Sequence, residues 1–194
     1  MQLTGNKEKD SEYYDGLYLR GFTAAEYYPI YKFALQILKS FPSPRVLELG
    51  CGLGDMAKMI MAEGISYRGF DYSEEAIKRC KNLCPQGDFR VGNIYNDNDY
   101  KPFDYNTVIA LEVLEHVDDM QIFRSIPPGV RLIASVPNFK DKAHLRIYED
   151  IKEDIIERYW PYFQVLAIKT FKGNSPGTDY EANVHLFHGI KMLS

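Results

Sequence analysis

Apolar and polar residues follow two different periods along the chain, and the two periods alternate. Between residues 45 and 136, short apolar runs typical of buried strands are separated by stretches with the spacing of amphipathic helices. Alternating strands and helices indicate a parallel sheet with helices on both faces. The predicted strands are residues 45–49, 67–71, 89–91, 105–111 and 131–136, and the predicted helices lie near residues 55–63, 73–83 and 118–124.

Both ends of the chain depart from this alternation. Residues 1–11 are polar and are expected to be disordered, whereas residues 12–40 have helical spacing and are expected to form an N-terminal lid. Near the other end, residues 162–171 and 182–192 are strand-like runs joined by a linker rich in turn residues, so they can pair antiparallel. The pattern contains no repeat, and we expect one α/β domain over residues 1–194.

The first of the alternating strands breaks into a glycine-rich turn, ELGCGLG, before a helix opens. Glu48 precedes Gly50, Gly52 and Gly54 in this turn. Glycine adopts positive φ and lets a ligand approach the backbone, and open α/β sheets bind nucleotides at such turns. A dinucleotide fingerprint needs its third glycine at position 55, which is Asp55 here. Because Glu48 and Asp55 would repel a pyrophosphate, a cationic nucleoside without phosphate, such as S-adenosylmethionine, fits better.

The motif ELGCGLG resembles the first motif of the class I S-adenosylmethionine-dependent methyltransferases, and the resemblance extends from about Arg45 to the C-terminus. It implies a Rossmann-like three-layer sandwich around a mostly parallel seven-stranded sheet, with one antiparallel strand near the C-terminus. It also implies S-adenosylmethionine as the cofactor and S-adenosylhomocysteine as its product. The cofactor-binding residues that the resemblance assigns to the turn are Glu48, Gly50, Cys51, Gly52 and Gly54.

Residues after the next two strands extend the predicted cofactor site. Asp71 ends a strand 21 positions after Gly50, a spacing that suits a carboxylate accepting hydrogen bonds from the ribose hydroxyls. Alternatively, Asp71 is a helix-capping or surface residue with no role in binding. Tyr72 could lie against the adenine face, or could be one of many tyrosines with no special role. In the family, the loop after the third strand caps the adenine, which assigns Asn93 and Ile94 here, and a plain Gly-Asn turn is the alternative.

The run VIALEVLEHVDD ends a strand near Leu111, a further expected cofactor contact, and continues with Glu112, Glu115 and His116. It resembles the Glu-x-x-Glu-His segment of methyltransferases that modify quinone precursors and related small molecules. A similar segment in small-RNA 3′-terminal 2′-O-methyltransferases holds a divalent metal. Our principal interpretation makes His116 and Glu112 catalytic, with His116 a general base or an orienting group, and includes no metal. The alternatives are a metal site of Glu112, Glu115, His116 and His144, or a purely structural role.

Two further segments are candidates for substrate binding. Residues 137–150 follow the fifth strand and form an expected substrate wall, in which Asn138 and His144 could contact the acceptor. An ordinary solvated loop is the alternative. Tyr14 and Tyr18 in the expected lid are one helical turn apart and could attract a sulfonium through cation–π contacts, or could only anchor the first helix by packing.

Composition limits the partners. The chain has 194 residues, of which 45% are hydrophobic, enough for a sizeable core. A net charge of −4 argues against broad neutralisation of nucleic-acid phosphates without excluding a local basic patch. No apolar stretch predicts a membrane span or a signal peptide. The three cysteines lack metal-site spacing and indicate reduced thiols in a cytoplasmic protein, whose oligomeric state the sequence does not reveal.

These observations predict an S-adenosylmethionine-dependent methyltransferase acting on an oxygen or nitrogen of a small-molecule acceptor. In-line methyl transfer needs mainly a dry pocket that aligns the two reactants, so the acceptor is hard to infer from sequence. Three alternatives stay open: a metal-assisted RNA 2′-O-methyltransferase, an NAD-dependent oxidoreductase, and a non-catalytic S-adenosylmethionine-binding protein.

Overall fold

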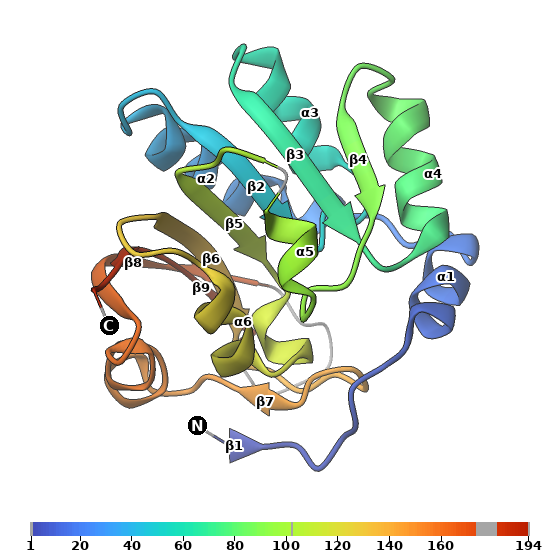
Figure 1. The fold of residues 1–194 in the computed structure, drawn as a ribbon. Coiled ribbons are helices and arrows are strands. Elements are labelled where there is room, and N and C mark those ends of the chain that lie inside the picture. Colours follow the sequence, from blue (N-terminus) through green and yellow to red (C-terminus); the bar gives the residue numbers. More distant parts are fainter. Residues whose placement is uncertain (1, 102, 174–181, 194) are drawn as a thin grey trace. The chain divides into compact units, whose positions relative to one another are not determined.

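A large β-sheet organises the chain. A computed structural model describes residues 2–101, 103–173 and 182–193. The strands of the sheet are β2 (Arg45–Leu49), β3 (Ser66–Asp71), β4 (Asp88–Val91), β5 (Thr107–Leu111), β6 (Arg131–Pro137), β8 (Phe163–Lys172) and β9 (Asn183–Lys191). Within the described residues their order is β4-β3-β2-β5-β6-β9-β8, and β9 runs antiparallel to both of its neighbours (Figure 1). The expected α/β fold, with a mostly parallel seven-stranded sheet and one antiparallel strand near the C-terminus, is confirmed.

The elements fall into two compact units, one of residues 9–109 and one of residues 1–8 and 110–194. In the unit of residues 9–109, Val46 of β2 is in parallel register with Tyr67 of β3 and with Thr107 of β5. Val46 and Leu47 are fully buried, as expected for a strand covered on both faces. Helix α3 (Asp55–Ala62) follows β2, α4 (Glu74–Leu83) follows β3, and α5 (Asp97–Tyr100) follows β4.

The expected N-terminal helical segment of this unit consists of α1 (Ser11–Leu19), η1 (Ala25–Tyr27) and α2 (Tyr28–Lys39). Helix α1 begins after Asp10, whose side chain accepts a hydrogen bond from the backbone N–H of Tyr13. The carboxylate of Asp15 accepts from the hydroxyl of Ser73 and from the backbone N–H of Glu75, at 3.1 Å for the latter. These bonds join α1 to the N-terminus of α4.

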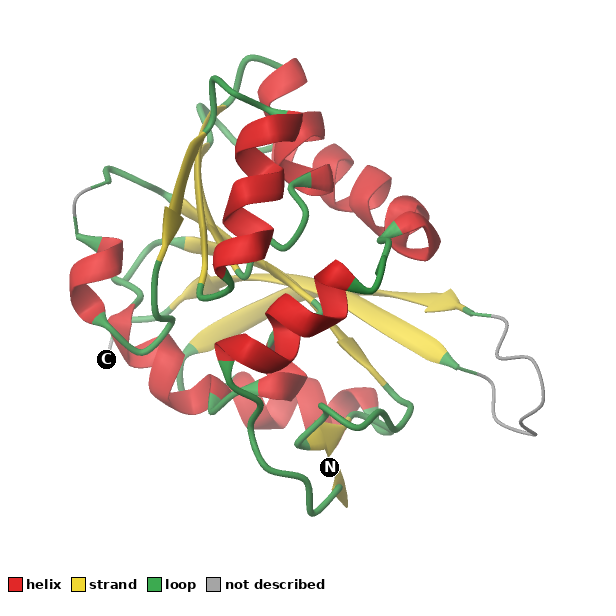
Figure 2. Cartoon of the chain, turned by 90° about the vertical axis from the view of Figure 1, so that its right-hand side faces the viewer, coloured by secondary structure: helices red, strands yellow, loops and turns green. Residues whose placement is uncertain are grey.

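The unit of residues 1–8 and 110–194 contains the antiparallel part of the sheet. Ala134 of β6 lies opposite Phe187 of β9, and both are fully buried. Strands β8 and β9 lie side by side as two long arrows in Figure 2. The turn-rich linker expected between them falls mostly on residues 174–181, outside the described residues. The short helical elements after β5 are η2 (Leu114–His116) and α6 (Asp119–Ser125).

The N-terminal end differs from the sequence expectation. Residues 1–11 are expected to be disordered, but Gln2–Leu3 form strand β1, which pairs antiparallel with β7 (Arg146–Ile147). The two strands lie together in Figure 1. The expectation of disorder is wrong for this segment because its order comes from backbone hydrogen bonds to a distant loop and not from apolar side chains.

The segment between β6 and β8 also contains elements that the pattern does not predict, namely β7 and the π-helical segment η3 (Ile151–Glu157). Residues of this segment pack around the side chain of Asp119, which has 0% of its surface exposed. Its carboxylate accepts from the guanidinium of Arg158 at 2.6 and 3.0 Å and from the hydroxyls of Tyr159 at 2.8 Å and Tyr148 at 3.2 Å. Arg146 adds an ion pair at 3.1 Å. A buried charge with this many partners is compensated.

Candidate functional site

The glycine turn and Asp71 are joined by a direct hydrogen bond. Gly50, Gly52 and Gly54 all have positive φ, between 50° and 84°. The backbone N–H of Gly52 donates to Asp71 Oδ2 at 3.0 Å, and the N–H of Ser73 donates to Oδ1 at 2.9 Å. Each carboxylate oxygen keeps a second lone pair that can accept a ligand hydroxyl. Burial raises the pKa of Asp71 to about 6, partly offset by these N–H donors, so the group is mostly ionised at neutral pH.

Glu48 lies beneath the turn and is almost fully buried. The hydroxyl of Tyr67 donates to its Oε2 at 2.5 Å. Burial raises the pKa of Glu48 to about 8, so its carboxyl is mostly protonated at neutral pH. The sequence argument that Glu48 repels a phosphate by its charge is therefore weakened. The negative charges that would repel a phosphate are instead those of Asp71 and Asp55.

Cys51 and Gly54 show how tightly the turn packs against α4. Cys51 is buried, with its Sγ 4.0 Å from the Sγ of Cys80. The Cys80 thiol also lies 3.1 Å from the carbonyl oxygen of Gly52. A Cβ placed on Gly54 would lie 3.0 Å from Cys80 Sγ, so glycine is required at position 54 both for its φ of +84° and for space.

Aromatic side chains from α1 border this turn. The hydroxyl of Tyr18 lies 3.5 Å from the position that a Cβ on Gly52 would occupy. The ring of Tyr14 packs on the ring of Tyr72 with centroids 5.5 Å apart, and the hydroxyl of Tyr72 donates to the Lys9 carbonyl. Tyr14 and Tyr18, predicted to contact the acceptor, therefore gather beside the predicted cofactor residues.

The loop after β4 contains a carboxylate that the sequence interpretation missed. Asn93 is exposed and forms a turn, in which its Oδ1 accepts from the N–H of Tyr95 at 2.9 Å. Asp99 Oδ2 in turn accepts from the N–H of Asn93 at 2.9 Å. Asp99 thus holds the backbone of Asn93 in this turn. The carbonyl of Ile94 is held by the hydroxyl of Tyr100 at 2.7 Å.

Glu112 follows β5, whose last residue, Leu111, is buried. The backbone φ of Glu112 is 54°, which is unusual for a residue with a side chain and stores strain. Its backbone N–H donates to the Ser135 hydroxyl at 2.9 Å, and that hydroxyl donates to Glu112 Oε1 at 2.7 Å. Burial raises the pKa of Glu112 to about 7. Ser135 holds both the strained backbone and the carboxyl group of Glu112 in place, and its role was not apparent from sequence.

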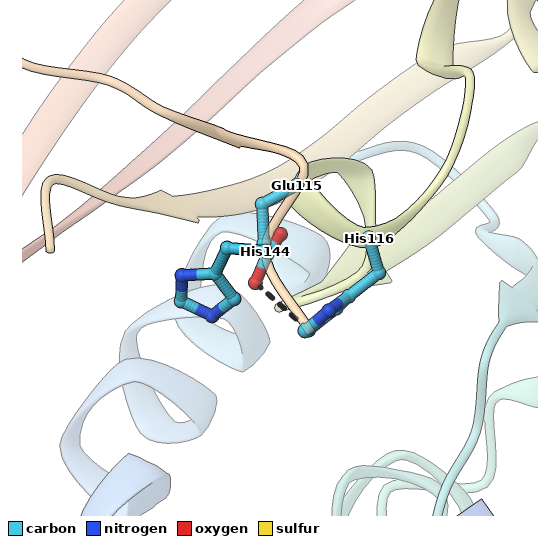
Figure 3. A group of neighbouring side chains, drawn as sticks. All are labelled: Glu115, His116 and His144. Carbon is cyan, nitrogen blue, oxygen red and sulfur yellow. Dashed lines mark ion pairs between the residues drawn. The ribbon is translucent and has the colours of Figure 1, made fainter. Parts of the chain in front are cut away.

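Glu115, His116 and His144 gather in one place, although His144 is 28 positions away from His116 along the chain. One ligand atom from each of the three lies within 4.8 Å of the others. Figure 3 shows the carboxylate of Glu115 lying beside both imidazole rings. Three of the four residues of the alternative metal site thus come together, whereas the fourth, Glu112, is bonded to Ser135.

The carboxylate of Glu115 is the unusual member of this cluster. Its side chain is 0% exposed, and among the described residues neither oxygen has a hydrogen-bond partner. The Nε2 atom of His116 lies 3.4 Å from its Oε1. Burial first, and repulsion by Glu112 second, raise the pKa of Glu115 well above its usual range. An unsatisfied buried carboxylate is expensive, and a bound cation would relieve that cost.

Both histidines are oriented as metal-binding histidines usually are. His116 Nδ1 lies 3.1 Å from the Ala143 carbonyl, and His144 Nδ1 lies 2.9 Å from the Phe139 carbonyl. A carbonyl only accepts, so each Nδ1 carries the hydrogen and each Nε2 has a lone pair to offer. Burial, and secondarily the ring of His144, lower the pKa of His116 to about 4. His116 is therefore neutral at pH 7, but it is a weak general base.

Asn138 has a structural partner. Its backbone N–H donates to the Asn183 carbonyl at 2.9 Å, and its Oδ1 accepts from the Asn183 N–H at 2.7 Å. The side chain thereby extends the pairing of β6 with β9 by one residue. Its predicted contact with the acceptor stays a prediction.

Comparison with known proteins identifies the family. The family model described as "Methyltransferase domain" matches residues 20–169. The chain belongs to this family. The resemblance read from the glycine turn is thereby confirmed. No helix in the described part of the chain combines the length and apolar character needed to cross a bilayer.

Individual proteins are similar to this chain in sequence or in fold. A ubiquinone biosynthesis O-methyltransferase of Nitrosomonas europaea is 29% identical over 135 residues, which are 65% of this chain and 57% of that protein. The chain thus spans somewhat more than half of that relative's length. Among solved structures, the PH0226 protein from Pyrococcus horikoshii OT3 has a TM-score of 0.66 at 16% identity, covering 90% of this chain and 98% of that one. The N-methyltransferase NodS from Bradyrhizobium japonicum WM9, in complex with S-adenosyl-L-homocysteine, has a TM-score of 0.62 at 16% identity and covers 84% and 86%. At these identities the structures show the shared fold alone.

Proposed function

We propose that this protein transfers the methyl group of S-adenosylmethionine to an oxygen of a small-molecule acceptor. The observation that carries the proposal is the bond between Gly52 and Asp71, which combines the glycine turn and an ionised carboxylate in one compact unit. A nucleoside with a ribose diol and no phosphate matches that combination. Membership of the methyltransferase domain family supports the same ligand.

The proposed cofactor roles follow from the contacts of this unit. Asp71 accepts hydrogen bonds from the ribose hydroxyls, while Gly52 and Ser73 keep its carboxylate in place. Gly50 and Gly52 leave their backbone open to the ligand. Tyr18, packed beside Gly52, helps to exclude water from that part of the pocket.

We further propose that Glu115, His116 and His144 hold a divalent cation. The fit rests on the Glu115 carboxylate, which accepts no hydrogen bond from the described residues, and on two imidazoles whose Nδ1 hydrogens are taken by backbone carbonyls. When bound, such a cation polarises a coordinated hydroxyl of the acceptor and lowers its pKa. This assignment replaces a general-base role for His116, because a histidine with a pKa of about 4 removes a proton poorly at neutral pH.

Calorimetric titration tests the cofactor assignment. We expect S-adenosylhomocysteine to bind the wild-type protein and NAD not to bind. Asp71→Ala should weaken binding by about ten- to a hundredfold, the cost of losing charge-assisted hydrogen bonds. Asp104→Asn, on an exposed carboxylate paired with Arg45, is the matched control and should leave the affinity unchanged. Equal affinities of Asp71→Ala and wild type would refute the ribose role.

Activity assays test the acceptor and the cation. Hydroxylated quinone precursors are the first acceptors to try, because the relative from Nitrosomonas europaea is named for ubiquinone biosynthesis. Formation of S-adenosylhomocysteine should stop after chelation and return with Mg²⁺ or Mn²⁺. Activity that survives thorough metal removal would refute the cation. The same cluster also suits metal-assisted 2′-O-methylation of RNA, and methylation of an RNA 3′ end but of no small molecule would select that function.

A further inference from the structure

The N-terminal arm, residues 2–6, lies against the loop that carries His144. Strand β1 of the arm pairs with β7 in the register Leu3 to Arg146. Beyond β1, the backbone N–H of Thr4 donates to the Leu145 carbonyl at 3.0 Å. All of these residues belong to the same compact unit.

Two side chains of the arm converge on one atom, the backbone carbonyl oxygen of His144. The hydroxyl of Thr4 donates to it, and Asn6 Nδ2 donates to it at 2.9 Å. Asn6 Nδ2 also donates to the carbonyl of Asp141 at 2.9 Å. The arm is polar, so these hydrogen bonds are what hold it in place together with the β1–β7 pairing.

The opposite side of the same loop is bonded to the turn that carries the other two cluster residues. The backbone N–H of Leu145 donates to the carbonyl of Glu115 at 2.7 Å. The carbonyl of Ala143 accepts from His116 Nδ1 at 3.1 Å. Residues 143–145 are therefore held between the arm on one side and the residues of η2 on the other.

We propose that the N-terminal arm positions His144, so that the affinity of the Glu115–His116–His144 cluster for a divalent cation depends on Thr4 and Asn6. The inference rests on the proposed cation site. Residues 143–145 belong to no helix or strand, so the hydrogen bonds on their two sides fix where the His144 backbone lies. Bonds that orient a metal ligand without touching the metal contribute strongly to metal affinity. Thr4 and Asn6 are positioning residues in this sense.

Mn²⁺ binding to the full chain, followed by electron paramagnetic resonance, tests the proposal. We expect the double variant Thr4→Val/Asn6→Ala to bind Mn²⁺ at least about tenfold more weakly than wild type, in line with other outer-shell substitutions. Thr4→Ser keeps the hydroxyl and should retain wild-type affinity. Lys7→Ala, at the next, exposed position of the chain, is the matched control and should also bind as wild type does.

A second readout separates failure of the arm from failure of the cation site. Nitrogen-15 NMR of the histidine rings reports the position of His144 without any metal. If wild type binds no Mn²⁺, the cation site is wrong, and displaced His144 ring signals in the double variant still support a positioning arm. If the double variant keeps wild-type His144 signals, or if it keeps wild-type Mn²⁺ affinity while only its thermal stability falls, the positioning role is overturned.

Discussion

The substitution Glu115→Gln should stabilise the metal-free protein and lose that advantage when metal is bound. In the metal-free protein the Glu115 carboxylate is 0% exposed and both oxygens lack a hydrogen-bond partner among the described residues. A neutral amide of nearly the same shape removes a group that must either bury its charge or take up a proton when the protein folds. The free energy of unfolding in chelator should therefore rise, although most substitutions of buried residues lower it.

The magnitude follows from the raised pKa and not from the missing partners, because a glutamine amide would lack the same partners. Each unit by which burial raises the pKa of Glu115 costs wild type about 1.4 kcal/mol at a pH above that value, so we expect a gain of about 1–3 kcal/mol at pH 8. With metal at a hundred times its Kd, wild type gains about 2.7 kcal/mol from binding, which the variant largely forfeits. The advantage of Glu115→Gln should then disappear or reverse.

Urea unfolding followed by circular dichroism, in chelator and in saturating Mn²⁺, measures both effects. Glu149→Gln, on an exposed glutamate of the same compact unit, is the matched control, because water already solvates the charge that it removes. It should change the unfolding free energy little under either condition. If Glu115→Gln is less stable than wild type in chelator, the carboxylate is satisfied in a way that our reasoning excludes. If Mn²⁺ stabilises wild type and Glu115→Gln equally, Glu115 is not a metal ligand.

Three further predictions concern the unit of residues 9–109. The affinity for S-adenosylhomocysteine should fall as the pH drops through about 6, the raised pKa of Asp71, and calorimetry on Asp71→Asn should show no such fall. Gly54→Ala should lower the urea-unfolding free energy by about 1–3 kcal/mol, more than Gly64→Ala, because both have positive φ but only the Gly54 Cβ meets a neighbour. Glu48 has a pKa of about 8 when folded and an ordinary value of 4.5, so its stabilising contribution is complete below pH 4.5 and is lost as the pH rises through 8. Between pH 5 and 8, stability should therefore decline more steeply in wild type than in Glu48→Gln, as equilibrium unfolding at several pH values will show.

The sequence alone determined the order of the main elements and the place of the cofactor turn. Strands such as 45–49 and 131–136 lie within one or two residues of their observed bounds, because a buried strand must be apolar along its length. The closeness of Gly52 and Asp71 was predictable for a similar reason. Asp71 ends one of two parallel, neighbouring strands, and Gly52 comes three residues after the end of the other, so chain direction alone brings both to the same edge of the sheet.

Only the tertiary structure decided which polar residues act together at the other candidate site. Glu112 and Glu115 look equivalent in the sequence, yet one is bonded to Ser135 and the other is buried without a hydrogen-bond partner among the described residues. The N-terminal arm looks disordered because it is polar, yet Thr4 bonds to the backbone of a residue 140 positions away. The local hydrophobic pattern indicates which side chains are buried. The partners of a buried polar group come from distant segments of the chain, so the local pattern does not indicate them.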